Sequence, residues 1–493
     1  MSRNFIFYAL VIAIFGSLLW FVFDQGAKLD VIQSPPTVTG ETGEAMDGQN
    51  PDTITTSQPS VIIAFIRDLL ANLEHPLSLL LSQIVIIVIL SRLLASVMGK
   101  IGQPMVIGEI IAGILLGPSV LGYFWPGVSN FIFQAGSLPN LNFLSQLGLI
   151  LFMFIIGLEL DIHLLRRKAH TAVVVSHASI IIPFTMGVSL AYFLYVRFAP
   201  EHISFLAFGL FMGIAMSITA FPVLARILHE RGLTKTALGS LAITCAAADD
   251  VTAWCILAAV IAIVQAGSFV SAVFTVVLSI VYVITMLKLV RPWLEQRETQ
   301  YASTESLNRT FAVISFVVLF LSALTTEVIG IHALFGAFLA GASMPAHAGF
   351  RKLLASRIED VSLVILLPLF FAFTGLKTQI GLLHDGLTWL VCGLIIAVAV
   401  VGKFGGSLLA AKFTGQSWSD SFAIGVLMNT RGLMELIVLN IGYDLGVLSP
   451  TVFTMMVLMA LVTTFMTAPA LYWIERFRWK SESVSAKSLP ERL

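Results

Sequence analysis

The stretch Ala246-Ala247-Ala248-Asp249-Asp250 places two adjacent carboxyl groups inside an apolar run. That run extends from Ala237 to Gln265 and is otherwise free of charged residues. A bilayer-spanning helix needs about 20 apolar residues, so the run is long enough to hold both groups near the membrane midplane. A single charge there costs about 2.5–3.5 kcal/mol on insertion scales, and such residues usually mark ion or proton paths. The alternative is that both groups face a polar cavity and only hold helices together.

The composition indicates the class of protein. Of the 493 residues, 57% are hydrophobic and 11% are charged, and the mean hydropathy is +0.94. Soluble globular chains carry about 25% charged residues. We therefore predict an integral, all-α polytopic membrane protein. The formal net charge is zero, so no overall polyanion-binding surface is indicated and no nucleic-acid partner is expected.

The cysteines predict neither a disulfide framework nor a metal site. Cys245, Cys255 and Cys392 all lie in apolar runs. Cys245 and Cys255 are separated by about 15 Å along one helix, which is too far for a disulfide. We interpret all three as small core residues. No cofactor is expected, and no metal beyond a transported ion.

The chain divides into four predicted parts: residues 1–23 form an N-terminal membrane helix, 24–76 an acidic extracytoplasmic linker, 77–475 the main membrane domain and 476–493 a short cytoplasmic tail. The apolar run Phe5 to Phe23 is longer than the ~7–15-residue core of a signal peptide and lacks a clear cleavage site. We therefore favour a retained helix over a cleaved signal. The linker is polar and mostly acidic, as in poorly ordered segments.

Apolar runs and basic residues predict the topology. About thirteen runs between Leu77 and Trp473 are expected to form core helices, in addition to the N-terminal one. With the N-terminus inside, four of the 28 Lys and Arg residues fall outside, Lys403 and Arg431 fall within spans, and the remaining 22 fall inside. This distribution agrees with the positive-inside rule and predicts a cytoplasmic C-terminus.

Two predicted spans contain backbone interruptions. In the stretch from Gly213 to Pro222, the proline lacks an amide and clashes with the carbonyl of Ile218, four residues back. This interruption lies in the fifth core span, and a second one lies in the twelfth. The two spans cross the membrane in opposite directions. Paired interruptions in two inverted halves point to a transporter binding site.

The second interruption, from Met428 to Glu435, combines Gly432 with two charges and two further polar residues. Half-helix ends at such interruptions present partial charges at the midplane. The alternative is that Pro222 only kinks its helix and that Arg431 and Glu435 form a buried i,i+4 ion pair.

The two aspartates predict separate roles. Asp249 and Asp250 point about 100° apart around their helix, so they need not share one proton. One can bind a cation while the other faces a basic partner. Lys403, in the glycine-rich stretch Val401 to Gly406, is the candidate partner, because its glycines allow close helix approach. A charged Lys403 would pair with Asp249 and release its proton when a cation arrives; the alternative is snorkelling toward the inner interface.

Other ionisable residues give weaker signals. Glu109 lies near the inner end of a span, and Glu159 and Asp161 close another; they could line an entry path or form a solvated helix end. Lys377, at an outer helix end, is predicted by position alone to be a surface lysine. His177 and His332 could relay protons, but satisfied histidines are favoured. No metal spacing is present among the histidines at 163, 170, 177, 332 and 347.

The chain resembles the cation/proton antiporter-2 family of bacterial Na⁺/H⁺ and K⁺/H⁺ antiporters and the related plant cation/H⁺ exchangers. The resemblance extends from about Leu77 to Trp473. Its motifs are Gly108-Glu109-Ile110-Ile111-Ala112-Gly113-Ile114-Leu115-Leu116-Gly117-Pro118, Phe154-Ile155-Ile156-Gly157-Leu158-Glu159-Leu160-Asp161, Thr219-Ala220-Phe221-Pro222-Val223-Leu224-Ala225-Arg226, Ala248-Asp249-Asp250 and Asn429-Thr430-Arg431-Gly432-Leu433-Met434-Glu435-Leu436.

This resemblance implies a homodimer whose dimerisation domain supports a moving core with two crossed, broken helices. Asp250 matches the ion-binding aspartate, and Asp249 matches the variable position before it. Lys403 looks like the core lysine that pairs with the first aspartate, and Thr219 would lie at the first crossover. As supporting residues the resemblance and the breaks together suggest Glu109, Ser217, Pro222, Lys377, Arg431 and Glu435.

The ion remains open between Na⁺ and K⁺. Leu376-Lys377-Thr378 and the stretch Asn429 to Leu436 look most like plant-type exchangers, which are associated with K⁺ and usually carry Asn before the aspartate. In the related bacterial antiporters, a double Asp accompanies electrogenic exchange, commonly of Na⁺. No nucleotide-binding tail like that of the glutathione-gated potassium efflux proteins follows Trp473 in this sequence, so regulation of that kind is not expected.

The expected function is secondary active exchange of a monovalent cation for protons by alternating access in a bacterial inner membrane, with cation and proton competing for Asp250. An enzyme is not expected. An intramembrane aspartyl protease would need two acids facing each other from separate helices, whereas Asp249 and Asp250 are adjacent. A sodium-coupled organic-anion transporter is the stronger alternative, because it also uses crossed broken helices and Arg431 could bind a carboxylate.

Overall fold

The computed structural model describes residues 3–28, 72, 75–159, 169–231, 233, 236–265, 269–301, 309–345 and 348–487. Within these ranges the chain is helical and contains no strand. In the described part of the chain, ten helices are long and apolar enough to cross a membrane, and the bent pair α21 (Trp418–Met428) and α22 (Leu433–Asp444) makes up to eleven. Shorter apolar helices cover Val11–Ala27, Phe205–Ser217 and Ala333–Ala342. The all-α polytopic class is confirmed, while the count of thirteen core helices stays a prediction.

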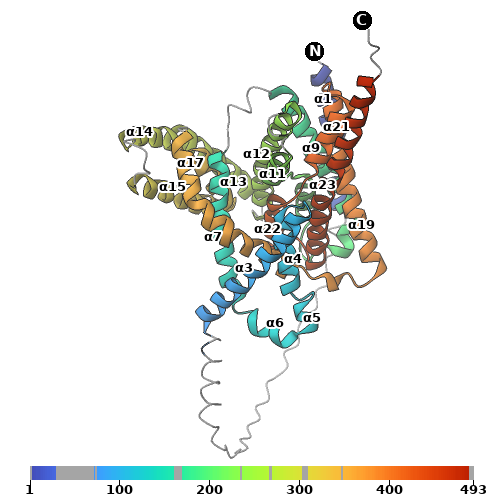
Figure 1. The fold of residues 1–493 in the computed structure, drawn as a ribbon. Helices are drawn as coiled ribbons and strands as arrows, with labels where there is room; N and C mark the ends of the chain where they lie inside the picture. The colour runs from blue at the N-terminus through green and yellow to red at the C-terminus, as the bar shows by residue number, and fades with distance from the viewer. Residues whose placement is uncertain are drawn as a thin grey trace, which may run out of the picture.

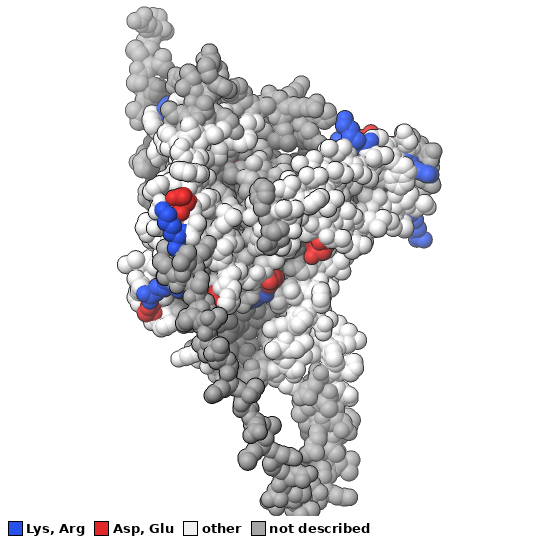
Figure 2. Space-filling model, turned by 180° about the vertical axis from the view of Figure 1, so that it is seen from behind, with Lys and Arg blue, Asp and Glu red and all other residues white. Residues whose placement is uncertain are grey.

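Much of the described surface of the molecule is apolar, as the hydrocarbon core of a bilayer requires. Figure 2 shows a broad face with few Lys, Arg, Asp or Glu atoms among the described residues. The helix α13 (Phe269–Thr285) exposes large apolar side chains such as Phe274 and Ile280. In water these would form an unstable apolar patch, but hydrocarbon is a good solvent for them. The exposed apolar face is therefore consistent with a bilayer environment.

One group of helices, which we call the scaffold bundle, is built on α18 (Leu367–Lys377) and α7 (Leu138–Glu159). It also contains α3 (Pro76–Lys100), α4 (Met105–Leu116), α15 (Arg309–Ile329), α16 (Ala333–Ala342) and α17 (Ala348–Val361). Helix α18 packs against α3, α4 and α7, and α7 packs against α16 and α17. In Figure 1, α13, α14 (Arg291–Tyr301) and α15 extend to one side of the molecule. The closest pairs within the bundle are α3 with α4, α4 with α18, α7 with α16 and α15 with α16.

Glycines set the close approach of these scaffold helices. A Cβ atom on Gly157 of α7 would lie 2.2 Å from a carbonyl oxygen of α16, and one on Gly341 of α16 would lie 2.2 Å from a carbonyl oxygen of α7. Gly113 of α4 and Gly375 of α18 repeat the arrangement at 2.0 and 2.4 Å. Only glycine fits at such contacts, because lipid supplies little hydrophobic drive and the helices must gain contact by close packing.

The second group, which we call the core bundle, contains the long α9 (Ala169–Phe198) and α12 (Ala237–Gln265). Its other members are α10 (Phe205–Ser217), α11 (Phe221–Glu230), α19 (Gly386–Val400), α20 (Gly406–Phe413), α21, α22 and α23 (Pro450–Lys487). Helix α9 packs against α10, α12 and α20, and α23 packs against α19 and α21. The N-terminal α1 (Arg3–Ala27) joins this group through α9 and α10, with the rings of Phe23 and Phe205 5.9 Å apart.

Two details differ from the sequence predictions. The first interruption covers residues 218–220, so Pro222 is the second residue of α11, where its missing amide is not needed. Cys255 was predicted to be a core residue, and this is wrong: its side chain is exposed, whereas Cys245 and Cys392 are buried. The reason is that α12 presents one face outward, and a position ten residues from Cys245 falls on a different face.

Candidate functional site

The two interruptions meet in the middle of the core bundle. The amide of Ala220 donates to the carbonyl oxygen of Thr430 at 2.9 Å, and the Thr219 hydroxyl, whose single proton points mainly to Asp249, also lies 3.1 Å from the carbonyl oxygen of Met428. The second interruption bends the chain by 40° between α21 and α22. The Thr464 hydroxyl of α23 donates to the carbonyl oxygen of Arg431 at 2.7 Å. Backbone groups freed by the breaks are therefore satisfied across the crossing, as a low-dielectric interior requires.

Two cations bind the C-terminal end of α10. Arg431 donates from Nη1 to the carbonyl oxygen of Ala215 at 2.8 Å and from Nη2 to that of Met216 at 2.6 Å. Lys403 Nζ donates to the carbonyl oxygen of Ser217. Helix C-termini carry a partial negative charge and four unpaired carbonyls, so positive groups are favoured there. Both cations are fully buried.

Asp249 is saturated with donors. Its carboxylate accepts from Lys403 Nζ at 2.6 Å, from the Thr219 hydroxyl at 2.6 Å, from the Ser179 hydroxyl at 2.7 Å and from the Ser176 hydroxyl at 3.1 Å. Lys403 also donates to the Ser179 carbonyl oxygen at 2.9 Å. The structure thus brings Asp249, Lys403 and Thr219 together. Sequence reasoning missed Ser176 and Ser179; the available signal was two hydroxyls three residues apart, on one face of an apolar helix.

Asp250 has the opposite environment. Its side chain is 4% exposed, and no side chain of the described residues donates to either carboxylate oxygen; only the backbone amide of Phe221, at the start of α11, faces it as a weak donor. It leaves α12 about 100° from Asp249, and this rotation separates it from the donors of its neighbour. An ionised carboxylate buried without a basic partner is costly, so the site favours a proton or a bound cation at this position. Asp250 is therefore the acid of the crossing that is paired with no basic side chain, and we call it the open acid.

The predicted supporting residues serve mostly to hold the crossing. Arg431 Nη1 lies 3.4 Å from Glu435 Oε2, and both side chains are fully buried. The buried ion pair considered above is therefore present, together with the contacts of Arg431 to α10. The hydroxyl of Ser217 donates to the Ile214 carbonyl oxygen at 2.9 Å, so it is the Ser217 backbone that reaches Lys403.

The ionisable side chains of the crossing contain one more acid than bases. If all are ionised, the three acids Asp249, Asp250 and Glu435 face the two bases Lys403 and Arg431, which leaves one negative charge in a buried space. One proton or one monovalent cation would neutralise it. No group of three or more potential metal-ligating side chains occurs among the described residues. The arrangement is suited to a single, exchangeable positive charge.

The remaining acids lie outside the crossing. Glu109 is 7% exposed and lines a cavity of about 360 Å³ together with Arg92, Glu359 and Asp360. Val223 of α11 and Leu433 of α22 line the same cavity, so it reaches the edge of the crossing. Glu159 is exposed at the end of α7, as in a solvated helix end. Asp161 lies outside the described residues.

The histidines have local partners. The Nδ1 atom of His177 lies 2.8 Å from the Val173 carbonyl oxygen, and His332 accepts from the Leu334 amide at 3.4 Å as the cap of α16. These contacts support the satisfied-histidine interpretation. The side chains of His163, His170 and His347 lie outside the described residues.

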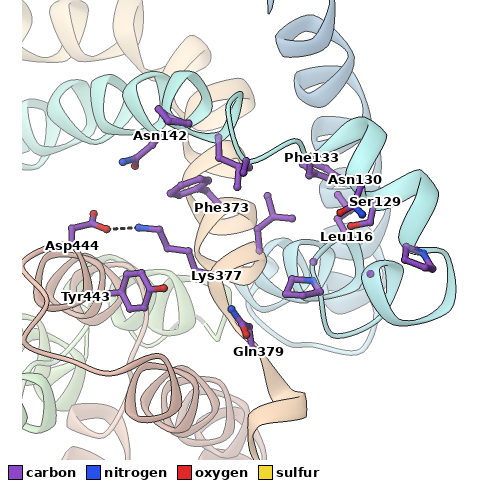
Figure 3. Close-up of a pocket in the computed structure, with 18 residues that line it drawn as sticks. Leu116, Ser129, Asn130, Phe133, Asn142, Phe373, Lys377, Gln379, Tyr443 and Asp444 are labelled. Atoms are coloured by element: carbon purple, nitrogen blue, oxygen red, sulfur yellow. Dashed lines mark hydrogen bonds and ion pairs between the residues drawn. The ribbon is translucent and has the colours of Figure 1, made fainter. Parts of the chain in front are cut away.

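Lys377 is not the surface lysine that its position predicted. Its Nζ lies 2.6 Å from Asp444 Oδ1, and its side chain is only 14% exposed. The ammonium lies 4.7 Å from the ring centroid of Phe373 and 5.1 Å from that of Tyr443. Figure 3 shows the pair at one side of a cavity. The prediction was wrong because the partner comes from α22, which is distant in sequence but adjacent in space.

Crossed, interrupted helices around buried carboxylates define a secondary transporter. Residues 85–473 match the family described as "Sodium/hydrogen exchanger, transmembrane". The chain therefore belongs to the sodium/hydrogen exchanger family of cation/proton antiporters, which confirms the resemblance found in the sequence. This is a family of transporters and not of enzymes.

Relatives within the family extend over most of this chain. The chain is 44% identical over 396 residues to the Na(+)/H(+) antiporter NhaS4 of Synechocystis sp., covering 80% of this chain and 97% of the relative. It is 41% identical over 398 residues to Cation/H(+) antiporter 17 of Arabidopsis thaliana and 35% identical over 407 residues to K(+)/H(+) antiporter 1 of Saccharomyces cerevisiae. These alignments cover 80% and 81% of this chain, which spans about half the length of both relatives, 48% and 46%.

A solved structure has the same fold. The sodium proton antiporter MjNhaP1 from Methanocaldococcus jannaschii superposes with a TM-score of 0.62 at 15% sequence identity. The match covers 81% of this chain and 98% of that one. The arrangement of helices is therefore shared.

Proposed function

We propose that this protein exchanges a monovalent cation for protons across the membrane by alternating access, with both competing for Asp250. The single observation that carries the proposal is a buried carboxylate, at the crossing of two interrupted helices, that is paired with no base and to which no side chain of the described residues donates a hydrogen bond. The names of the relatives, which include Na⁺/H⁺ and K⁺/H⁺ antiporters, support the same class of substrates.

Competition follows from the charge of the crossing. One proton on Asp250 neutralises the buried cluster, and so does one monovalent cation, but both together would leave a buried positive charge. A cation requires oxygen ligands. Asn429 is 6% exposed, and its Oδ1 atom, like both oxygens of Asp250, lacks a hydrogen-bond partner among the described residues. In this proposal these oxygens replace water around an arriving ion, whereas the oxygens of Glu435, which also lack a hydrogen bond, stay with Arg431.

Asp249 and Lys403 supply a second proton-linked group in this proposal. When a cation is bound and Lys403 gives up its proton, the crossing carries one net negative charge, which lies on Asp249 and is stabilised by its three hydroxyl donors. The glycine-rich π-helical turn Val401–Gly405 places this lysine in the bundle interior and not at a lipid interface. Its full burial argues against snorkelling, the alternative that the sequence left open.

Alternating access is supported by the separation of the two bundles. Every residue of the crossing belongs to the core bundle, so a rigid shift of that bundle would carry the ion site with it. In this proposal the scaffold bundle stays fixed. The homodimer, the inner-membrane location and the cytoplasmic C-terminus belong to the same proposal and follow from the resemblance and the distribution of basic residues.

The organic-anion alternative depends on Arg431, and the geometry does not favour it. Both terminal nitrogens of the Arg431 guanidinium already bind carbonyl oxygens of α10, and one also pairs with Glu435. A substrate carboxylate would have to displace these contacts to obtain bidentate recognition. A small cation at Asp250 requires no such displacement.

The test is dissipation of a pH gradient in proteoliposomes at clamped membrane potential, with Na⁺, K⁺ and Li⁺ supplied separately. We expect exchange with at least one of these ions, and the comparison identifies it. Asp250→Asn is expected to abolish exchange while the protein remains folded. The matched control is Glu295→Gln, which alters an exposed carboxylate in an i,i+4 pair on α14. Wild-type exchange in the Asp250→Asn variant would overturn the assignment.

A further inference from the structure

A seam runs between the two bundles, formed by α18 of the scaffold bundle and α22 of the core bundle. In its middle, Asn440 Nδ2 donates to the Thr374 hydroxyl at 2.8 Å, and both side chains are buried. One turn farther along each helix, Lys377 pairs with Asp444 at 2.6 Å. Because both links keep nearly the same sequence offset, the two helices run in the same direction. The Lys377–Asp444 pair therefore closes the C-terminal end of the seam.

Each end of this seam borders a cavity. A space of about 680 Å³ lies beside Lys377 and Asp444, lined also by Asn142 of α7 and Ser129 of α6 (Pro126–Ile132). Figure 3 shows these side chains around the opening. The cavity of about 360 Å³ lies at the other end, beside Leu433. Free volume at both ends gives the core bundle space to shift along α18, which close packing would deny it.

The ion pair is built more tightly than a surface pair. The Lys377 ammonium lies over the ring of Phe373 from its own helix and over the ring of Tyr443 from the core bundle. It thus contacts the core bundle through both a carboxylate and an aromatic face. Exposed ion pairs contribute little, whereas partly desolvated cation–π contacts contribute more. Lys377 is therefore the principal charged contact of this seam among the described residues.

We propose that Lys377 and Asp444 form a latch that holds the core bundle in the position seen here and must open in every transport cycle. The inference rests on the alternating access proposed above. Asp444 is a positioning residue in this role: it acts on the orientation of α22, whose first turn carries Glu435, and does not touch the transported ion. Loss of the latch shifts the balance between the two positions of the core bundle and leaves the ion site itself intact.

The test measures seam opening directly and without transport. In a chain whose three native cysteines are replaced, Thr374→Cys places a thiol at the fully buried centre of the seam. Its rate of labelling by a membrane-permeant maleimide reports opening. We expect Lys377→Gln to raise that rate by about five- to tenfold, the range for a partly desolvated pair with cation–π contacts.

The pair is tested as a unit with Asp444→Asn and with the double variant Lys377→Gln/Asp444→Asn. If the two residues act through each other, the double variant labels about as fast as either single one, because coupled changes are not additive. The matched control is Arg197→Gln. It breaks an exposed Arg197–Asp385 pair at 3.6 Å within the core bundle, so the labelling rate should not change.

Each outcome decides one of the two proposals. Faster labelling in both single variants without further increase in the double variant supports the latch, including on an Asp250→Asn background that does not transport. Unchanged labelling in Lys377→Gln, or an equal increase in Arg197→Gln, overturns it. If the wild-type protein shows no exchange, the antiport proposal is overturned. The labelling result still decides whether Lys377 and Asp444 hold the seam closed, because it does not depend on transport.

Discussion

The scaffold and core bundles hold their interiors together by different means. Among the described residues, six charged side chains are less than one-tenth exposed, and five of them belong to the core bundle: Asp249, Asp250, Lys403, Arg431 and Glu435. The sixth, Glu109, lines the cavity between the bundles. The scaffold bundle relies on glycines such as Gly157 and Gly341, which bring backbone against backbone; the core bundle has such contacts too, at Gly187 and Gly213, but adds the buried charges.

This difference separates a supporting part from a working part. Close packing through glycine gives a rigid body with little polar cost, as expected where lipid supplies no hydrophobic drive. Buried charges stabilise only when they are fully paired and are costly otherwise. Their concentration in one bundle, where Asp250 is the acid that is paired with no base, indicates that this bundle carries the exchange. The following variants test that contrast, from the largest expected effect to the smallest.

Removing Arg431 should affect folding most strongly. Arg431→Gln leaves two carbonyl oxygens of α10 and the buried Glu435 without their cation, and breaking a buried pair in this way costs about 3–5 kcal/mol. We expect a large loss of monodisperse protein and a lower unfolding temperature in detergent. Arg291→Gln, which breaks an exposed i,i+4 pair, is the control. Equal unfolding temperatures for the two variants would contradict this account of the core.

Removing Lys403 should change coupling and not only stability. In Lys403→Gln, Asp249 keeps its hydroxyl donors, so we expect exchange to persist at a reduced rate with about one charge less moved per cycle. The measurement is transient current on a solid-supported membrane together with the pH-gradient assay. An unchanged ratio of charge to protons would remove Lys403 from the proposed proton path.

Adding a methyl group in the scaffold should lower stability without changing the ion site. In Gly157→Ala the new Cβ would lie 2.2 Å from the Phe338 carbonyl oxygen, and overpacking of this kind costs about 1–3 kcal/mol. Gly393→Ala on α19 is the matched control, because a Cβ atom at that position would have no other atom of the described residues within 4 Å. The readout is the unfolding temperature in detergent, with cation selectivity unchanged. A stable Gly157→Ala variant would show that the scaffold helices are not locked by this contact.

The smallest effect is expected from one hydroxyl at Asp249. Ser179→Ala removes one of four donors and should lower the free energy of unfolding by about 1 kcal/mol, with exchange retained. Ser189→Ala on the same helix is the control, because its hydroxyl donates to the Thr185 carbonyl oxygen, one turn back on that helix. A larger loss of exchange in Ser179→Ala than in Lys403→Gln would reverse the order of importance proposed for these contacts.

Much of this organisation was predictable, and the limits have physical reasons. The interruptions near Pro222 and Gly432 were visible because proline and glycine stand out in apolar runs, although the position of the first break shifted toward residues 218–220. The environment of Lys377 was not predictable, because Asp444 comes from a helix 67 positions away. The exposure of Cys255 was missed for a similar reason: hydropathy does not tell which face of α12 meets lipid.

The amino-acid sequence alone determined the membrane class, the two interrupted spans and the location of the paired acids. It did so because a lipid solvent makes every buried charge, proline and glycine conspicuous against an apolar background. Only the tertiary structure decided that Asp249 is saturated while Asp250 is open, and that Ser176, Ser179 and Lys403 make the difference. Partners from distant helices are chosen by packing, which no local pattern records.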